Sequence, residues 1–187
     1  MLTIEKLNQY YPNEEMTSQR HMETLLREKP EVYHKDEGPH HVMMYVEADE
    51  FVFIDYVFVS AEARGQGIGR KLIDKLKAKG KPILLEVEPL DYENSDTEKR
   101  QRFYTREGFR HAKRVGYRRR SLATDRVNEL EILFWTPGTH GEDDVFDAMR
   151  RTYEGIHTFR DVEFYGKPYQ PVHEVLTLDE GERTRSA

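Results

Sequence analysis

Arg64-Gly65-Gln66-Gly67-Ile68-Gly69 is the stretch that decides the fold of this chain, because it separates a strand-like segment from a helix-like one. The apolar run 51–59 precedes it, and a helical pattern follows it as far as Gly80. Alternating glycines let the backbone approach a bound group closely, and the first turn of a helix offers N–H groups without intrahelical partners. Together with the positive end of the helix dipole, these features predict a phosphate-binding loop.

Two common phosphate loops do not match this stretch. The dinucleotide fingerprint G-x-G-x-x-G fails because Arg70 stands at the position of the third glycine. The P-loop pattern fails because no glycine of the chain precedes Lys-Ser or Lys-Thr. The pattern that remains, R-x-x-G-x-G, resembles the acyl-CoA pyrophosphate loop of the GNAT superfamily of N-acetyltransferases.

A second motif supports this resemblance. Residues 103–109, Phe-Tyr-Thr-Arg-Glu-Gly-Phe, look like the second signature of the family, an aromatic-Tyr-x-x-x-Gly-Phe run at the end of a helix. Residues 54–59 look like the strand before the loop, and the spacing leaves room for one helix and the strand 82–88. The resemblance is specific over residues 50–110 and extends to about residue 137.

The family implies an α+β fold of three layers. Its central sheet is mixed, mostly antiparallel and twisted, is flanked by helices, and splays between its fourth and fifth strands. We expect residues 1–137 to form this core, 138–178 to form a C-terminal extension packed on the same domain, and 179–187 to be a flexible tail. The alternatives for the extension are a cover over the substrate cleft and a contact in a homodimer.

Hydrophobic periodicity and capping signals predict the individual elements. Four helices are predicted, over the segments Asn13 to Pro30, Ile68 to Gly80, Ser95 to Gly108 and Glu142 to Gly155. In the second of them, Leu72, Ile73 and Leu76 lie on one apolar stripe. The predicted strands are 2–7, 40–47 and 51–59 as a hairpin, 83–87, 109–118, 129–135 and 172–178.

Composition excludes several classes of protein. The chain has 187 residues, of which 37% are hydrophobic and 34% charged, and it carries no cysteine. Disulfides and thiolate chemistry are therefore excluded, and a reducing cytoplasm fits. No apolar run approaches the roughly 20 residues of a membrane span, and the N-terminus lacks the layout of a signal peptide. The eight histidines show no metal-ligand spacing, so we expect no metal site.

The net charge of −6 hides a basic block. Between Lys99 and Arg120 there are ten Lys or Arg residues and a single acid, Glu107. Three interpretations stay open: a solvated face, attraction of the CoA phosphates, and binding of a polyanion such as nucleic acid. Tyr104 and Tyr117 lie among the basic residues, but no nucleic-acid-binding module is visible, so nucleic acid is an unlikely partner.

The resemblance implies a set of acetyl-CoA contacts. The exposed backbone of the strand before the loop pairs with the pantetheine arm, and the loop receives the pyrophosphate. In the place of an asparagine and a small residue of the family, this chain has Thr97 and Arg100. The implied cosubstrate-binding residues are Val57, Val59, Arg64, Gly65, Gln66, Gly67, Ile68, Gly69, Arg70, Asn94 and Tyr104.

Acyl transfer from a thioester to an amine needs a deprotonated amine and a proton for the departing thiolate. By resemblance, Tyr104 lies near the CoA sulfur and protonates it, since an ordinary tyrosine has a pKa of about 10. The alternative for Tyr104 is a half-buried core residue. As base we rank Asp55 and Glu88 equally; Glu86 shares a strand face with Glu88. A salt bridge or a polar edge is the alternative for each carboxylate.

The leading hypothesis is an acetyl-CoA-dependent N-acetyltransferase that moves an acetyl group directly to a primary amine of a small molecule or peptide. Within the enzyme class, a protein lysine or N-terminus is a further acceptor. The alternative from another class is a non-catalytic GNAT-fold module that binds acyl-CoA or a polyanion. The partners that this predicts are acetyl-CoA, an amine acceptor and a possible second copy of the chain.

Overall fold

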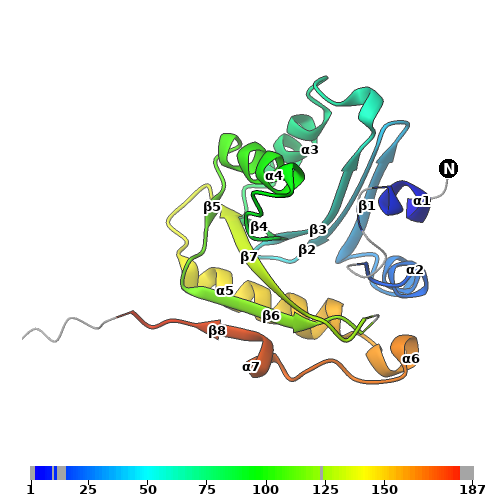
Figure 1. Ribbon diagram of the computed structural model, residues 1–187, viewed down its shortest axis with the longest axis vertical. Helices are drawn as coiled ribbons and strands as arrows, with labels where there is room; N and C mark the ends of the chain where they lie inside the picture. The colour runs from blue at the N-terminus through cyan, green and yellow to red at the C-terminus, as the bar shows by residue number, and fades with distance from the viewer. Residues whose placement is uncertain (1–2, 10, 12–15, 123, 182–187) are drawn as a thin grey trace, which may run out of the picture.

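The computed structural model describes residues 3–9, 11, 16–122 and 124–181. Figure 1 shows a central sheet with helices on both faces. The eight strands follow the order β1-β2-β3-β4-β7-β6-β8, and β5 also pairs with β7. The pair β3·β4 is parallel, and the other pairs of the described residues are antiparallel. The predicted α+β fold, with a mixed and mostly antiparallel sheet flanked by helices, is confirmed.

Two helices precede the first strand among the described elements, and a group of helices lies between β7 and the last strand, β8. The helices are α1 (Thr3–Asn8), α2 (Gln19–Glu28), α3 (Ile68–Lys77), α4 (Ser95–Arg106), α5 (Glu142–Thr152), α6 (Asp161–Tyr165) and α7 (Val172–Val175), with a 3-10 turn η1 (Ala61–Ala63) and a π-helical turn η2 (Tyr153–His157). The strands are β1 (Tyr33–Gly38), β2 (His41–Glu47), β3 (Val52–Val59), β4 (Ile83–Val87), β5 (Arg110–His111), β6 (Val115–Arg120), β7 (Val127–Trp135) and β8 (Leu176–Leu178).

The two faces of the sheet have separate hydrophobic cores. On one face, the predicted stripe of α3 packs against strand residues such as Ile54 and Leu85, and α4 adds Tyr104. On the other face, α1, α2, α5 and η2 cover β1 to β3, β6 and β7. β3 is buried on both faces because it lies in the middle of this covered sheet.

The N-terminal prediction was wrong in one element. Residues 2–7 were expected as a strand, yet Thr3–Asn8 form α1, because Ile4 and Leu7 lie three residues apart and both face the core. The predicted helix start at 13–15 lies outside the described residues. The described α2 begins after Ser18, whose side chain accepts a hydrogen bond from the His21 N–H at 3.2 Å.

Strand β1 was not among the predicted strands. Tyr33 is its buried residue, and the rest of this edge strand is polar and partly or fully exposed. An edge strand with one solvated side needs no apolar run, so its hydrophobic pattern is too weak to read. Its antiparallel pairing with β2 places Tyr33 opposite Val46.

The C-terminal half differs from prediction in three places. The segment 109–118 splits into β5 and β6, because a turn closes with the Val115 N–H donating to the Ala112 carbonyl at 3.1 Å. The helix expected to stop at Gly155 continues through η2. The segment 172–178 is α7 followed by β8, which pairs with β6 and so adds an edge strand to the sheet.

The strands β3 and β4 pair over a short distance. Their parallel register runs from Val52 opposite Ile83 to Ile54 opposite Leu85. Beyond Ile54 both strands line the cavity described below. Counted along this chain, these are the third and fourth strands and not the fourth and fifth, because α1 replaces the expected first strand.

Candidate functional site

A cavity of about 1080 Å³ opens where β3 and β4 separate. The glycine loop, α4, β6 and β7 complete its walls. Gln66 lies outside the lining, and its side-chain amide donates to the Glu62 carbonyl at 3.2 Å. The predicted site residues that the cavity brings together are Asp55, Val57, Val59, Arg64, Gly65, Gly67, Ile68, Gly69, Arg70, Glu88, Asn94 and Tyr104.

The structure favours glycine at the three glycine positions of the loop for different reasons. Gly65 and Gly67 have φ of +82° and +76°, a region that glycine enters without strain. A Cβ at either position would meet no atom within 4 Å, so the space beside the loop is open. At Gly69, a Cβ would come within 3.3 Å of Phe103 Cζ, so this glycine lets α3 approach α4 closely.

The loop end of the cavity carries several cationic side chains. Gly67 is the N-cap of α3, so the unpaired N–H groups of the first helical turn lie next to the cavity. Such N–H groups and the helix dipole favour an anion. The lining cations are Arg64, Arg70, Lys99, Arg100 and Arg106, and the lining acids from the same region are Asp91, Asp96 and Glu107.

Helix α4 forms one wall with its polar start and its aromatic end. Asn94 caps the helix, since its side-chain oxygen accepts from the Asp96 N–H at 3.1 Å. The helix begins at Ser95 as predicted, with Asn94 as the cap. Tyr104 is 2% exposed, and its ring lies edge-on to Phe103 and Phe109 at 5.1 and 5.3 Å. Tyr104 is therefore a packed core residue that also lines the cavity.

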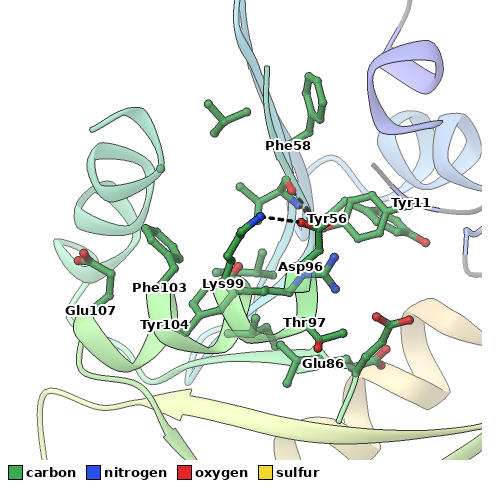
Figure 2. Close-up of a pocket in the computed structure, with 18 of the residues that line it drawn as sticks. Tyr11, Tyr56, Phe58, Glu86, Asp96, Thr97, Lys99, Phe103, Tyr104 and Glu107 are labelled. Atoms are coloured by element: carbon green, nitrogen blue, oxygen red, sulfur yellow. Dashed lines mark hydrogen bonds and ion pairs between the residues drawn. The ribbon is translucent and has the colours of Figure 1, made fainter. Parts of the chain in front are cut away.

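Tyr11 lines the cavity, and its hydroxyl hydrogen-bonds to the part of the β3 backbone that is expected to hold pantetheine. Its hydroxyl donates to the Val57 carbonyl at 3.1 Å and accepts from the Val57 N–H at 3.2 Å. Figure 2 shows Tyr11 on the side of the cavity opposite Phe103 and Tyr104. The Tyr11 ring packs edge-on to Tyr56 at 5.2 Å, and the Arg100 guanidinium lies 5.6 Å from its centroid.

Asp55 occupies a β-bulge in β3. Along β2, Met44 pairs with Tyr56 and the next residue, Tyr45, pairs with Ile54. No residue of β2 therefore lies opposite Asp55. A bulge changes the direction in which a side chain points, and bulges are common beside active sites. Asp55 lies on the same face as Phe53, which α2, α5 and η2 cover, and the bulge places Tyr56 on that face as well.

Two groups contact the Asp55 carboxylate on that face. The Tyr33 hydroxyl donates to Asp55 Oδ2 at 2.5 Å, and His157 Nε2 lies 3.5 Å from Oδ1. Burial, and then the negative charge of Asp55, raise the pKa of Tyr33 well above its ordinary value. The Tyr33 hydroxyl therefore keeps its proton and stays a donor.

Glu86 is the second carboxylate on this face, and Figure 2 shows it reaching into the cavity from β4. Its Oε2 is 3.6 Å from the Arg119 guanidinium, and its Oε1 is 3.7 Å from His157 Nδ1. Oε1 is buried without a hydrogen-bond partner among the described residues. Glu88 also lines the cavity, and its backbone carbonyl accepts a hydrogen bond from the Gln101 side chain at 3.1 Å.

Sequence reasoning missed most of this cluster. His157 was not singled out from the sequence, and Arg119 was considered only as part of the basic block between Lys99 and Arg120. The signal was absent because the partners come from β1, β3, β4, β6 and η2, which no short motif joins. Tyr11 was missed for the same reason, because its partner Val57 is distant in the sequence.

Neither a metal-ligating cluster nor a membrane-spanning helix is found among the described residues. No group of three or more His, Cys, Asp or Glu residues there could hold a metal ion. In the same part of the chain, no helix combines the length and the apolar character that crossing a membrane requires.

Comparison with known proteins identifies the family. A sequence model of the GNAT acetyltransferase domain matches residues 31–111, which span β1 to β5. The curated protein "Putative acetyltransferase YjbC" of Bacillus subtilis (strain 168) is 56% identical over 182 residues, or 97% of this chain and 95% of its own. A solved GNAT-family structure from Bacteroides thetaiotaomicron shares the fold, with 22% identity and a TM-score of 0.58 over 88% of this chain and 90% of its own. With a relative this similar over nearly its full length, the chain belongs to the GNAT family of acetyltransferases.

Proposed function

We propose that this chain is an acetyl-CoA-dependent N-acetyltransferase that transfers the acetyl group directly to a primary amine of a small molecule or peptide. The observation that supports this most is the course of the cavity. It runs from the cationic glycine loop, past Tyr104 and the gap between β3 and β4, to the carboxylates Asp55 and Glu86. A donor and an acceptor could thus meet at the gap from opposite faces of the sheet.

The donor side fits an acyl-CoA. The pyrophosphate lies against the loop between Arg64 and Arg70, where open space, backbone N–H groups and positive charge coincide. The pantetheine arm runs along β3 and pairs with the backbone of Val57 and Val59. Because the Tyr11 hydroxyl already bonds to Val57, this pairing requires that hydroxyl to leave.

The chemistry is divided between the two faces. A carboxylate on the acceptor side takes one proton from the ammonium, and the neutral amine attacks the thioester carbonyl. The C–N bond forms, the C–S bond breaks, and Tyr104 gives its proton to the departing thiolate. The second proton of the attacking nitrogen then restores Tyr104. Asp55 and Glu86 lie together on the acceptor face, and Glu88 lines the cavity beside them as the remaining candidate.

A specific observation also favours the second candidate function, a module that binds acyl-CoA without turnover. The Tyr11 hydroxyl occupies both polar groups of Val57, as it would in a protein that keeps this stretch of strand closed to the pantetheine arm. A cytoplasmic location and a homodimer stay predictions of the sequence.

One experiment separates the two functions. Free thiol release from acetyl-CoA is followed with a panel of primary amines and peptides, and CoA binding is measured by calorimetry on the same protein. Release that depends on the amine supports the enzyme. Tight CoA binding without release from any amine supports the binding module, and absence of CoA binding contradicts both.

A further inference from the structure

His157 lies between two carboxylates that come from different strands. Its Nε2 is 3.5 Å from Asp55 Oδ1, and its Nδ1 is 3.7 Å from Glu86 Oε1. The side chain is buried, and the Phe53 ring packs edge-on against it at 5.4 Å. The imidazole is therefore held with one nitrogen toward each carboxylate. It comes from η2, beyond the segment that matches the GNAT domain model.

Glu86 lines the cavity, and its side chain is 13% exposed. Its Oε1 is buried on the side of His157 and finds no hydrogen-bond donor among the described residues, whereas Arg119 lies beside the other oxygen. A buried carboxylate oxygen without a donor is unfavourable. An ammonium group that enters the cavity would meet this carboxylate, and its positive charge would offset the excess of negative charge from Asp55 and Glu86.

We propose that Glu86 receives the ammonium of the acceptor and that His157 is the positioning residue behind it, which holds the proton that Glu86 removes. This inference rests on the proposed function and deepens it. One proton moves from the ammonium to the Glu86 carboxylate and from its Oε1 to His157 Nδ1, and it leaves a neutral amine that attacks the thioester. The imidazolium then lies between two carboxylates, and its proton returns to solvent when the product leaves.

The neighbours of His157 suit this role. With Nε2–H directed at Asp55, the Nδ1 lone pair faces Glu86 and can take the proton. The titratable and charged groups around the ring are Asp55 on β3, Glu86 on β4, Tyr117 and Arg119 on β6, Tyr153 on η2 and His21 on α2, with the Tyr117 hydroxyl 3.5 Å from Nδ1.

The first test needs no turnover. In protein labelled with ¹³C and ¹⁵N at histidine, the His157 resonances are those that disappear in the His157→Gln variant. We expect the pH dependence of these resonances to change in Glu86→Gln and in Asp55→Asn, because each substitution removes a charged group beside one nitrogen of the ring. A pH dependence that stays unchanged in Glu86→Gln overturns the coupling between His157 and Glu86.

The second test is kinetic and uses a matched buried histidine. His21 hydrogen-bonds the Ile156 carbonyl of the same turn at 3.0 Å, so His21→Gln replaces a buried histidine in contact with η2 and leaves the ring between the carboxylates in place. We expect Glu86→Gln to lower kcat about 100-fold and His157→Gln about tenfold, with unchanged affinity for acetyl-CoA. His157→Gln also removes the acid limb of the pH profile of kcat/KM, whereas His21→Gln keeps it.

Equal losses in His157→Gln and His21→Gln, with the same pH profile, would show that His157 is only structural and would overturn the proposal. A wild-type protein that acetylates no amine overturns the proposed function and with it the acceptor role of Glu86. In that case the NMR titration still decides whether His157 and Glu86 share a proton, so the two failures are distinguishable.

Discussion

The hydroxyl of Tyr11 bonds to both backbone polar groups of Val57, at 3.1 Å to the carbonyl oxygen and 3.2 Å from the N–H. One phenol thus imitates the pair of bonds that an amide group forms with an exposed strand. The proposed pantetheine arm carries such amides and needs the same two groups. Tyr11 therefore competes with the cosubstrate for the backbone of β3.

Tyr11→Phe tests this competition. Phenylalanine keeps the ring against Tyr56 and Arg100 but leaves the Val57 groups unbonded in the free protein. A net hydrogen bond contributes about 1 kcal/mol, so CoA should bind about fivefold more tightly in calorimetry. The control is Tyr92→Phe, since Tyr92 is 92% exposed. Unchanged or weaker CoA binding in Tyr11→Phe would mean that pantetheine does not use Val57.

The glycine loop offers a prediction with a matched control at the other end of α3. Gly67 and Gly80 both have positive φ, +76° and +70°, and a Cβ at either would meet no atom within 4 Å. Alanine in this conformation costs about 1–2 kcal/mol, so both substitutions should lower the free energy of unfolding in urea similarly. Gly67 lines the cavity and Gly80 does not.

Gly67→Ala should therefore weaken CoA binding at least about tenfold, because its methyl group enters the space of the pyrophosphate and disturbs the N-cap of α3. Gly80→Ala should keep the wild-type affinity. Calorimetry with CoA on both variants makes the comparison. Equal affinities in the two variants would remove the pyrophosphate from this loop.

Tyr104→Phe tests the acid role apart from packing. Phenylalanine preserves the edge-on contacts with Phe103 and Phe109, so the variant should fold normally and bind CoA with wild-type affinity. Loss of a general acid lowers the rate by a factor of about 100, so kcat for thiol release should fall by that amount. If kcat is retained, Tyr104 is a core residue and another group protonates the thiolate.

The parts of the site that could be predicted are those that depend on neighbours in the sequence. The Gly65–Gly69 loop is recognisable because its glycines, the strand before it and the stripe of α3 lie within one short segment. The end of α3 shortly before Gly80 could be predicted for the same reason, since a positive φ after a helix favours glycine. Local signals of this kind are enough to predict the fold and the acetyl-CoA side of the proposed site.

The acceptor side could not be predicted, because it depends on register and tertiary contact. Asp55 has no partner on β2 and shares a face with Tyr56 because of a bulge, which is a property of the β2·β3 pair and not of the residues 54–56 alone. His157 comes between Asp55 and Glu86 because α5 continues as a π-helical turn. A helical pattern in the sequence predicts the helix but not this change of its winding.

His21 gives a prediction about stability and pH. Burial lowers its pKa from 6.5 to about 4, although the negative charge of Asp55 opposes the change. The neutral ring is held between the Ile156 carbonyl and the Tyr165 hydroxyl, each at 3.0 Å. Between these two pKa values the unfolded chain binds a proton at His21 that the folded chain does not bind. Acidification in this window therefore favours unfolding.

The free energy of unfolding should fall by up to about 3 kcal/mol from this residue as the pH drops from 6.5 to about 4, and it should be constant in this respect above 6.5. Urea unfolding at a series of pH values measures it. In His21→Gln the amide can still bond to both partners but cannot titrate, so its curve should be flatter than that of the wild type across this window. Parallel curves for the two proteins would show that His21 titrates alike in the folded and unfolded chains.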